Sequence, residues 1–230
     1  MEPINHKELR MRGLEVVKSN WKLSICAAFI AMLLSGVGSS FLPELDFSWT
    51  QELDKDFIWH MTDRSRITFS LNFDSLMNLC WFIIGGTIQL GYCNFLLKRQ
   101  RGEETQVGDL FTEFNRFGDG FAQHFLCQLY IFLWSLLLII PGIIKSFSYA
   151  MTPYIMAENP GMKAKDAITR SRAMMDGYKA DLFMLRLTFI GWDLLAVLTL
   201  NIGHLWLNPY KQAAETAFYQ EVKTRFVAQS

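Results

Sequence analysis

Residues 121–144 read FAQHFLCQLYIFLWSLLLIIPGII and contain no Asp, Glu, Lys or Arg. About twenty apolar residues in a helix cross the ~30 Å hydrocarbon layer of a membrane, at ~1.5 Å per residue. Buried helices of soluble proteins rarely stay free of charge over such a length. This segment therefore predicts helices inserted in a membrane, and it decides the fold class that we expect.

Two further charge-free runs support the same interpretation. Residues 23–42 and residues 75–97 each reach the length of a membrane span without a charged side chain. Hydrophobic residues make up 51% of the 230-residue chain, whereas charged residues make up only 19%. The distribution favours an all-α polytopic membrane protein over the alternative, a large all-helical soluble protein. The net charge of zero gives no indication of nucleic-acid binding.

The third apolar segment contains a predicted reversal of the chain. Residues 121–157 would be about 55 Å long as one helix, which is too long for a single crossing. Pro141 and Gly142 lie in its middle, and these residue types end or kink helices. We therefore predict an outgoing span that ends by Ile140 and a shorter returning span over residues 143–157.

The last apolar segment shows a similar arrangement. Residues 182–200 form the predicted outgoing span and residues 205–218 the returning one, with Gly203 and Pro209 as turn residues. These assignments predict six spans arranged as three hairpins. A five-span alternative keeps residues 187–209 as the last crossing.

The distribution of Lys and Arg orients the predicted spans. Basic residues are concentrated before the first run, after the second run, in the later polar stretch and near the chain end. Residues 43–73 instead carry three basic residues against six acids. The positive-inside rule then places both termini in the cytoplasm and residues 43–73 in an extracellular loop.

Two polar loops resemble each other at an offset of 57 residues, and the identical pairs are Asp109/Asp166, Thr112/Thr169, Asp119/Asp176 and Gly120/Gly177. Each loop has the apolar period of an amphipathic helix that lies at the membrane interface. The pattern predicts a single membrane domain built from three repeated units, residues 1–98, 99–158 and 159–230. Each unit is an interfacial helix followed by a two-span hairpin. Both Asp-Gly pairs are predicted helix ends, because Gly readily adopts the left-handed conformation there.

Ionisable residues within the predicted spans form the candidate site, and they are Lys145, Arg186, Asp193, Lys211 and Glu215. A lone charge at mid-membrane costs ~2.5–3.5 kcal/mol on insertion scales, so these groups should pair inside the helix bundle. We expect Asp193 to contact Lys145 or Lys211. We also expect Lys211 to pair with Glu215, which follows it by four residues on the same helix face. A static network and a proton or ion relay both fit this pattern.

The region after Ile139 resembles a known family. The motifs that carry the resemblance include Ile140-Pro141-Gly142-Ile143-Ile144-Lys145, Ala157-Glu158-Asn159-Pro160, Met174-Met175-Asp176-Gly177-Tyr178-Lys179 and Asn208-Pro209-Tyr210. They are similar to the bacterial membrane family catalogued as domain of unknown function 975. The resemblance implies a multi-pass protein of the bacterial plasma membrane and transfers no catalytic or binding residue. Asp193, Asn201 and Lys211 depart from the family pattern.

No motif for catalysis or for cofactor binding is present in the sequence. The four histidines lack ligand spacing, and the four cysteines lie in apolar runs without a C-x-x-C pair. We therefore expect no catalytic residue, no metal and no cofactor. The expected partners are membrane lipid and a protein in the membrane or at its cytoplasmic surface.

These observations favour a non-enzymatic accessory or scaffold protein that acts through protein or lipid contacts. Ionisable residues within the spans suggest a small transporter or channel as the first alternative. A lipid-acting membrane enzyme is the second alternative, although no nucleophile and base can be paired in the sequence.

Overall fold

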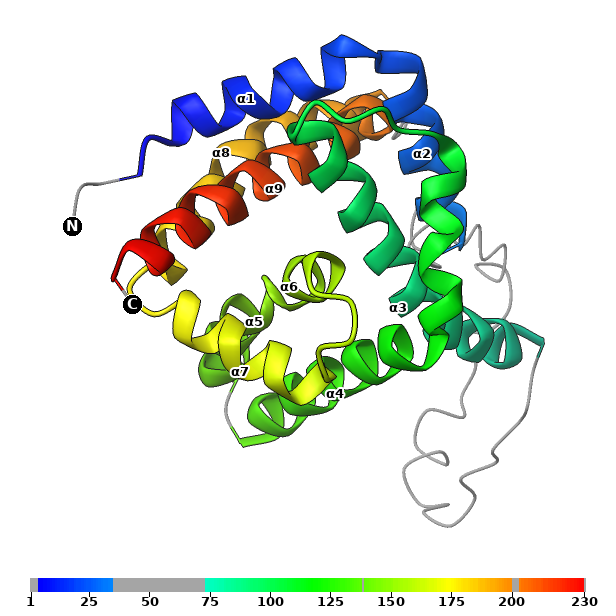
Figure 1. The fold of residues 1–230 in the computed structure, drawn as a ribbon, viewed down its shortest axis with the longest axis vertical. Helices are drawn as coiled ribbons and strands as arrows, with labels where there is room; N and C mark the ends of the chain where they lie inside the picture. The colour runs from blue at the N-terminus through cyan, green and yellow to red at the C-terminus, as the bar shows by residue number, and fades with distance from the viewer. Residues whose placement is uncertain (1–3, 35–72, 138, 200–202, 230) are drawn as a thin grey trace, which may run out of the picture.

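The computed structural model describes residues 4–34, 73–137, 139–199 and 203–229, and the regular elements in these ranges are all helical. The elements, drawn in Figure 1, are α1 (His6–Ser19), α2 (Trp21–Leu34), α3 (Phe73–Gln100), the 3-10 helix η3 (Val107–Arg116), α4 (Phe117–Leu137), α5 (Ile139–Tyr149), α6 (Thr152–Glu158), α7 (Ala164–Met174), α8 (Lys179–Leu198) and α9 (His204–Gln229). The predicted all-α class is confirmed. The predicted loop 43–73 lies outside the described residues, apart from its last residue.

Within the described ranges, no helix is both long enough and apolar enough to cross a membrane. The six-span arrangement stays a prediction.

The two predicted reversals of the chain correspond to breaks between helices. α4 ends at Leu137 and α5 begins at Ile139, so Pro141 and Gly142 lie in the first turn of α5 rather than at the break itself. Proline is tolerated there because the first backbone N–H groups of a helix have no partner within it. A side chain at Gly142 would lie 2.9 Å from the Cα atom of Ser135, so this glycine allows α5 to pack closely on α4.

The second break separates α8 from α9. α8 ends at Leu198 and α9 begins at His204, so residues 187–209 do not form one helix. Gly203 directly precedes α9, and its N–H donates to the hydroxyl of Thr199 at 3.0 Å. The assignment of Pro209 as a turn residue is wrong, because Pro209 lies inside α9. It falls in the second turn of this long helix, where the neighbouring turns keep the helical path.

The two loops of the predicted repeat are alike where their helices begin but differ at their Asp-Gly pairs. η3 begins at Val107 and α7 at Ala164, 57 residues later, so Asp109 and Asp166 both occupy the first turn of their helices. The prediction of two glycine helix ends is half wrong. Gly177 has φ = 84° just after α7, as expected, whereas Gly120 lies inside α4. A side chain at Gly120 would lie 2.9 Å from the Cα atom of Thr87, so this glycine serves close packing of α4 on α3.

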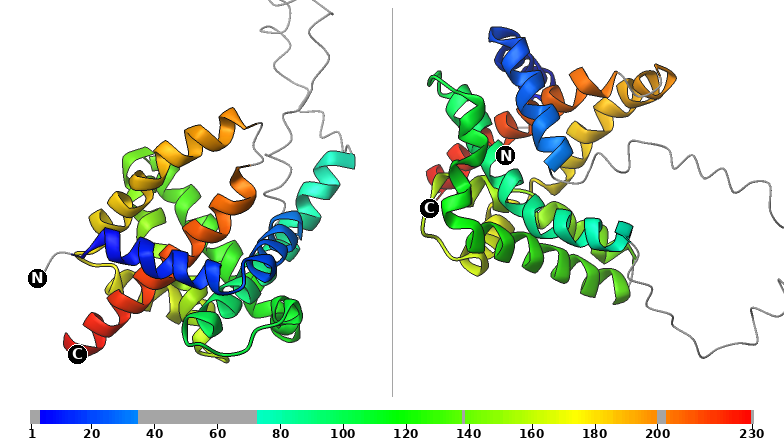
Figure 2. Two further views of the ribbon diagram at one scale, coloured as in Figure 1. Left: turned by 90° about the horizontal axis from the view of Figure 1, so that it is seen from above. Right: turned by 90° about the vertical axis from the view of Figure 1, so that its right-hand side faces the viewer.

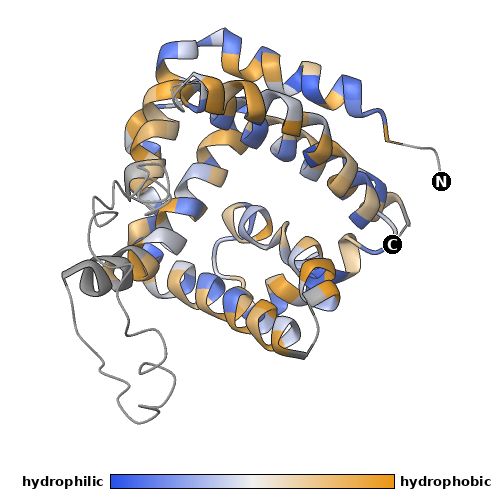
Figure 3. Cartoon of the chain, turned by 180° about the vertical axis from the view of Figure 1, so that it is seen from behind, coloured by the Kyte–Doolittle hydropathy of each residue, from blue (hydrophilic) through white to orange (hydrophobic). Residues whose placement is uncertain are grey.

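α9 is the helix on which much of the bundle is assembled. It packs against α1, α2, α3, α7 and α8, and its Ala213 and Ala214 are fully buried. α1 crosses it (Figure 2) so closely that a side chain at Gly13 would lie 2.7 Å from the backbone nitrogen of Ala214. The buried positions Leu9, Gly13 and Val17 recur every four residues, which places them on one face of α1. Figure 3 shows the corresponding alternation of hydrophilic and hydrophobic turns along α1.

Both ends of α1 are capped by side chains. The Asn5 side chain accepts hydrogen bonds from the backbone N–H groups of Lys7 and Glu8, which lack partners inside the helix. At the other end, the Arg99 guanidinium of α3 donates to the carbonyl oxygens of Val16 at 2.9 Å and Asn20 at 3.0 Å. A cation at the carboxyl end of a helix also interacts favourably with the helix dipole. Arg99 therefore attaches the carboxyl-terminal end of α3 to α1.

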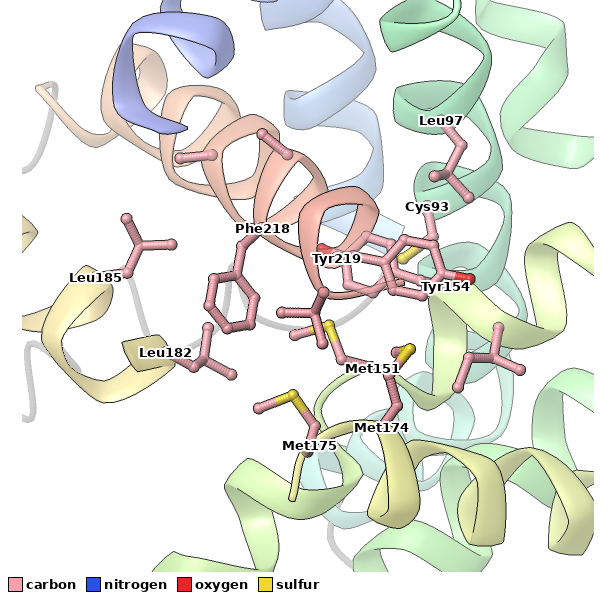
Figure 4. Packing of buried hydrophobic residues seen from close by; sticks show 14 of the residues in the cluster. Cys93, Leu97, Met151, Tyr154, Met174, Met175, Leu182, Leu185, Phe218 and Tyr219 are labelled. Atoms are coloured by element: carbon pink, nitrogen blue, oxygen red, sulfur yellow. The ribbon is translucent and has the colours of Figure 1, made fainter. Parts of the chain in front are cut away.

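The main hydrophobic core lies where α6, α8 and α9 meet, and Figure 4 shows its packing. Leu182 and Leu185 of α8 lie against Phe218 of α9 in this view. Beside them, the rings of Tyr154 and Tyr219 stack with their centroids 5.3 Å apart. This core holds α6 and α9 in the positions from which they line the site described next.

Candidate functional site

Asp193 and Lys211 form an ion pair between α8 and α9. The Lys211 ammonium donates to both carboxylate oxygens of Asp193, each at 3.0 Å. The His204 Nε2 atom lies 3.4 Å from the same carboxylate. Of the two alternative partners predicted for Asp193, Lys145 or Lys211, the structure contains Lys211.

Glu215 pairs with Arg186 and not with Lys211, so the expected pair within α9 is wrong. The Arg186 guanidinium donates to the two carboxylate oxygens of Glu215 at 2.8 Å and 3.2 Å. A planar guanidinium matches the two oxygens of a carboxylate, which makes such a two-point contact stronger than a single bond. Arg186 reaches Glu215 from α8, so both ion pairs join the same two helices.

Lys145 does not join the two ion pairs. Its ammonium lies 4.6 Å from the ring centroid of Trp134, in position for a cation–π interaction between α5 and α4. Among the described residues, no carboxylate lies within ion-pair distance of Lys145. The predicted five-residue network therefore consists of two separate pairs and one cation on an aromatic ring.

A polar cleft of about 390 Å³ opens beside these ion pairs. Its walls come from α3, α4, α5, α6, α8 and α9. The polar lining side chains are Gln89, Tyr92, Gln123, His124, Gln128, Ser146, Tyr149, Tyr154, Arg186, Asn208, Lys211, Gln212 and Glu215. Asp193 is not among them, although its partner Lys211 is.

The cleft has an exposed mouth and a buried floor. Gln89, Gln128 and Gln212 are exposed, whereas Tyr92 and Gln123 retain only 4% and 3% of their accessible surface. An adjoining cavity of about 380 Å³ extends toward α2, and the mouth glutamines line both spaces. The two spaces therefore adjoin at these glutamines, while α2 lines the second space with the apolar residues Ala28, Ala31 and Met32.

Two polar atoms at the floor lack partners. The side-chain oxygen of Gln123 and the hydroxyl of Tyr92 are buried and have no hydrogen-bond partner among the described residues. Most buried polar groups in proteins are hydrogen-bonded, so each exception requires an explanation. Both atoms belong to side chains that line the same cleft.

A second charged cluster surrounds Glu158 at the end of α6. The carboxylate accepts hydrogen bonds from the Tyr219 hydroxyl and the Lys223 ammonium, each at 2.6 Å, and it also pairs with Arg101. Burial raises the pKa of Glu158, but the hydrogen bonds from Lys223 and Tyr219 and the charges of Lys223 and Arg101 lower it by more. The pKa of Glu158 therefore lies below its usual value. The cluster joins the ends of α3, α6 and α9.

Charged residues alone do not indicate the cleft, because most of its polar lining is uncharged. The uncharged carboxamides Gln123, Gln128, Asn208 and Gln212 lie in the same apolar segments and line the cleft. Asn208 and Gln212 are four residues apart in α9, as are Lys211 and Glu215, and this spacing places each pair on one helix face. Carboxamides at helical spacing inside apolar segments were therefore the signal that could have revealed this site.

Residues 136–226 match the model of a family described as a protein of unknown function, DUF975. We call this matched part of the chain the DUF975 region. The DUF975 region contains both ion pairs, Lys145 and Glu158, whereas Gln89, Tyr92 and Gln123 come from the preceding part of the chain. The cleft is thus built jointly by the DUF975 region and by α3 and α4. Neither the curated proteins nor the solved structures gave a significant match to the chain.

The Asp193–Lys211 pair yields a test of its structural role. Both side chains are 30% exposed, so removing one leaves the other only partly hydrated. We expect Asp193→Asn to lower the free energy of unfolding by about 1–3 kcal/mol. The double variant with Lys211→Met should lose less than the sum of the single variants.

Thermal unfolding of the purified variants measures these effects, with Glu8→Gln as the control. Glu8 pairs with Arg12, and both side chains are about half exposed, so its loss should change little. A normal unfolding temperature in Asp193→Asn would show that the pair does not stabilise the fold.

The Glu158 cluster predicts a pH dependence of stability. Because the folded pKa lies below the unfolded value of about 4.3, the carboxylate stabilises the fold above that value. This contribution is lost as the pH falls through the folded pKa. We expect the unfolding temperature of the wild type to decrease when the pH is lowered below about 4. The unfolding temperature of Glu158→Gln should be lower than that of the wild type at pH 7, and it should change less on acidification. Equal pH profiles for the two proteins would contradict the prediction.

Proposed function

We propose that the protein is embedded in a cell membrane and that its polar cleft conducts or carries a small polar solute across it. The observation that supports this proposal most is an extensive apolar exterior together with a polar cleft between the helices. Soluble proteins rarely expose apolar patches of such extent. Polar and ionisable groups inside a membrane bundle commonly mark the path of a substrate or ion.

The apolar exterior is extensive on three helices. Exposed large apolar side chains include Phe132, Leu133 and Leu136 of α4, Ile140, Ile143 and Ile144 of α5, and Ile190, Leu194, Leu195 and Leu198 of α8. Leu136, Ile140 and Leu198 are each more than 70% exposed. Figure 3 shows the orange, hydrophobic turns on α4 and α5. Such surfaces are suited to contact with lipid chains.

The positions of these side chains agree with the predicted orientation. They cluster toward the end of α4, the start of α5 and the end of α8, which the topology prediction places away from the cytoplasm. In the left view of Figure 2, the start of α3 and the end of α8 point to the same side, away from both chain termini. The basic residues Lys98, Arg99 and Arg101 lie at the other end of α3. We propose that both termini face the cytoplasm.

An accessory role is the second candidate, and a stripe of phenylalanines on η3 and the start of α4 favours it. Phe111, Phe114 and Phe117 are exposed, and their rings lie next to one another, with centroids 5.9 Å and 6.3 Å apart. A partner helix or the membrane interface would cover such a stripe. This role would use a surface that is separate from the cleft, so the two functions are compatible.

Thiol labelling tests the proposed embedding. In a variant without the four native cysteines, Thr199→Cys lies between α8 and α9 on the proposed outer side. Asp176→Cys, at a position whose side chain is 85% exposed, lies on the proposed cytoplasmic side. We expect a membrane-impermeant maleimide to label position 199 in intact cells and position 176 only after permeabilisation. Labelling of position 199 only after permeabilisation would show that the α8–α9 hairpin does not reach the outer surface.

Passage of solute is tested by light scattering of proteoliposomes after an osmotic shock with glycerol or xylitol. We expect vesicles with the wild type to recover their volume faster than empty vesicles. Ala150 lines the cleft, so Ala150→Phe should slow this recovery by filling the space, while Ala150→Ser should not. Recovery at the rate of empty vesicles, with correctly inserted protein, would exclude passage of these solutes.

A further inference from the structure

We propose that the cleft is a binding site for an uncharged polyhydroxylated molecule of the size of a monosaccharide or sugar alcohol. The floor of the site is formed by Gln123 and Tyr92, and its mouth by Gln89, Gln128 and Gln212. This inference names the solute class of the proposed transport function and rests on the same cleft.

The charges that line the cleft are already compensated by the protein. Glu215 is neutralised by Arg186 through two hydrogen bonds, and Lys211 is neutralised by Asp193. A charged ligand would have to lose its hydration without gaining an unpaired opposite charge, and that desolvation is unfavourable. The balance of charge in the cleft therefore selects an uncharged ligand.

The uncharged lining groups match hydroxyl groups. Each of the five carboxamides offers both donors and acceptors, and a hydroxyl group needs one of each. Tyr92, Tyr149 and Tyr154 also line the cleft, where each presents only a small part of its ring. A cleft of this composition is complementary to a molecule that carries several hydroxyl groups.

The unpartnered atoms at the floor point to a ligand rather than to a structural role. A buried polar atom without a partner costs about 1–3 kcal/mol. The Gln123 oxygen and the Tyr92 hydroxyl both bear this cost on one wall of the cleft, between α3 and α4. A hydroxyl group of a bound molecule can donate to the Gln123 oxygen and accept from Tyr92. Ligand binding would thus offset the unfavourable free energy of these two unpartnered atoms, which folding alone leaves in place.

The size and access of the cleft fit this class of ligand. Pockets for small molecules typically measure ~300–1,000 Å³, and this cleft of about 390 Å³ lies at the small end of that range. The exposed glutamines at the mouth provide polar access to the cleft, and they also line the adjoining cavity. A compact molecule can therefore enter the cleft past the glutamines at its mouth.

The test measures thermal unfolding of the full chain in detergent with xylitol or glucose, and with inorganic phosphate or putrescine as charged probes. The proteins compared are the wild type, Gln123→Met and Gln100→Met. Gln100 is the matched control, because it lies outside the cleft and its side chain donates to the Ala213 carbonyl at 2.9 Å. We expect the neutral probes to raise the unfolding temperature of the wild type and of Gln100→Met at millimolar concentration. Their affinity for Gln123→Met should be about tenfold lower, the equivalent of one hydrogen bond.

The unliganded variants give a second, independent readout. Gln123→Met removes a buried unpartnered oxygen and only a 4.0 Å contact of its amide with the Cys127 sulfur, so its unfolding temperature without probe should equal or exceed that of the wild type. Gln100→Met also removes a buried unpartnered oxygen, but it loses the 2.9 Å hydrogen bond to the Ala213 carbonyl and should unfold at a lower temperature than Gln123→Met. Tyr92→Phe removes only the hydroxyl from the floor and should behave as Gln123→Met does, which keeps the test available if the glutamine variant does not fold.

Several outcomes would overturn the inference. Equal stabilisation of all variants by polyols would reflect general exclusion of solute from the protein surface and not a site. Stabilisation by phosphate or putrescine alone would refute the uncharged class, and no response to any probe would indicate a cleft filled by water only. A lower unfolding temperature of unliganded Gln123→Met would show that Gln123 is structural. Binding without volume recovery in proteoliposomes would retain this site and refute transport.

Discussion

The close contact between α9 and its neighbours is the constraint on which the rest of the structure depends. Alanines 213 and 214 keep one side of α9 small enough for the backbone of α1 to approach at Gly13. The other side of the same helix carries Lys211 and Glu215 toward the cleft. Larger residues in place of these alanines would move α9 away from α1 and, with it, both charged side chains.

The two ion pairs between α8 and α9 have a joint electrostatic effect. Each pair has one cation and one anion. Three of the four side chains line the cleft, and the fourth, Asp193, contacts Lys211 without lining it. The charges thus contribute polarity and rigidity to the wall without giving it a net charge. Selectivity in such a cleft is then determined by the carboxamides and hydroxyls, whose hydrogen-bonding groups have fixed directions.

The sequence was sufficient for the helical class and for the positions of the two breaks, because proline and glycine interrupt long apolar runs at few places. It also predicted Lys145 or Lys211 as the partner of Asp193, and Lys211 is the partner because both residues lie at similar distances from the break between α8 and α9. It assigned Glu215 to the wrong partner, because spacing within a helix contains no information about Arg186 on the neighbouring helix. Gly120 was misassigned for a related reason: a glycine that permits a turn and one that permits close packing are identical in sequence.

The contact between α1 and α9 has a consequence for how the chain is made. α1 docks on α9, which lies far later in the chain, and its final turn is capped by Arg99, 83 residues beyond Val16. During synthesis the apolar face of α1 therefore stays unburied until α9 has been made. A nearby lipid surface or a chaperone can cover Leu9 and Val17 during this time. The contact forms only after α9 has been synthesised, so a chain truncated before α9 would leave α1 without this docking site.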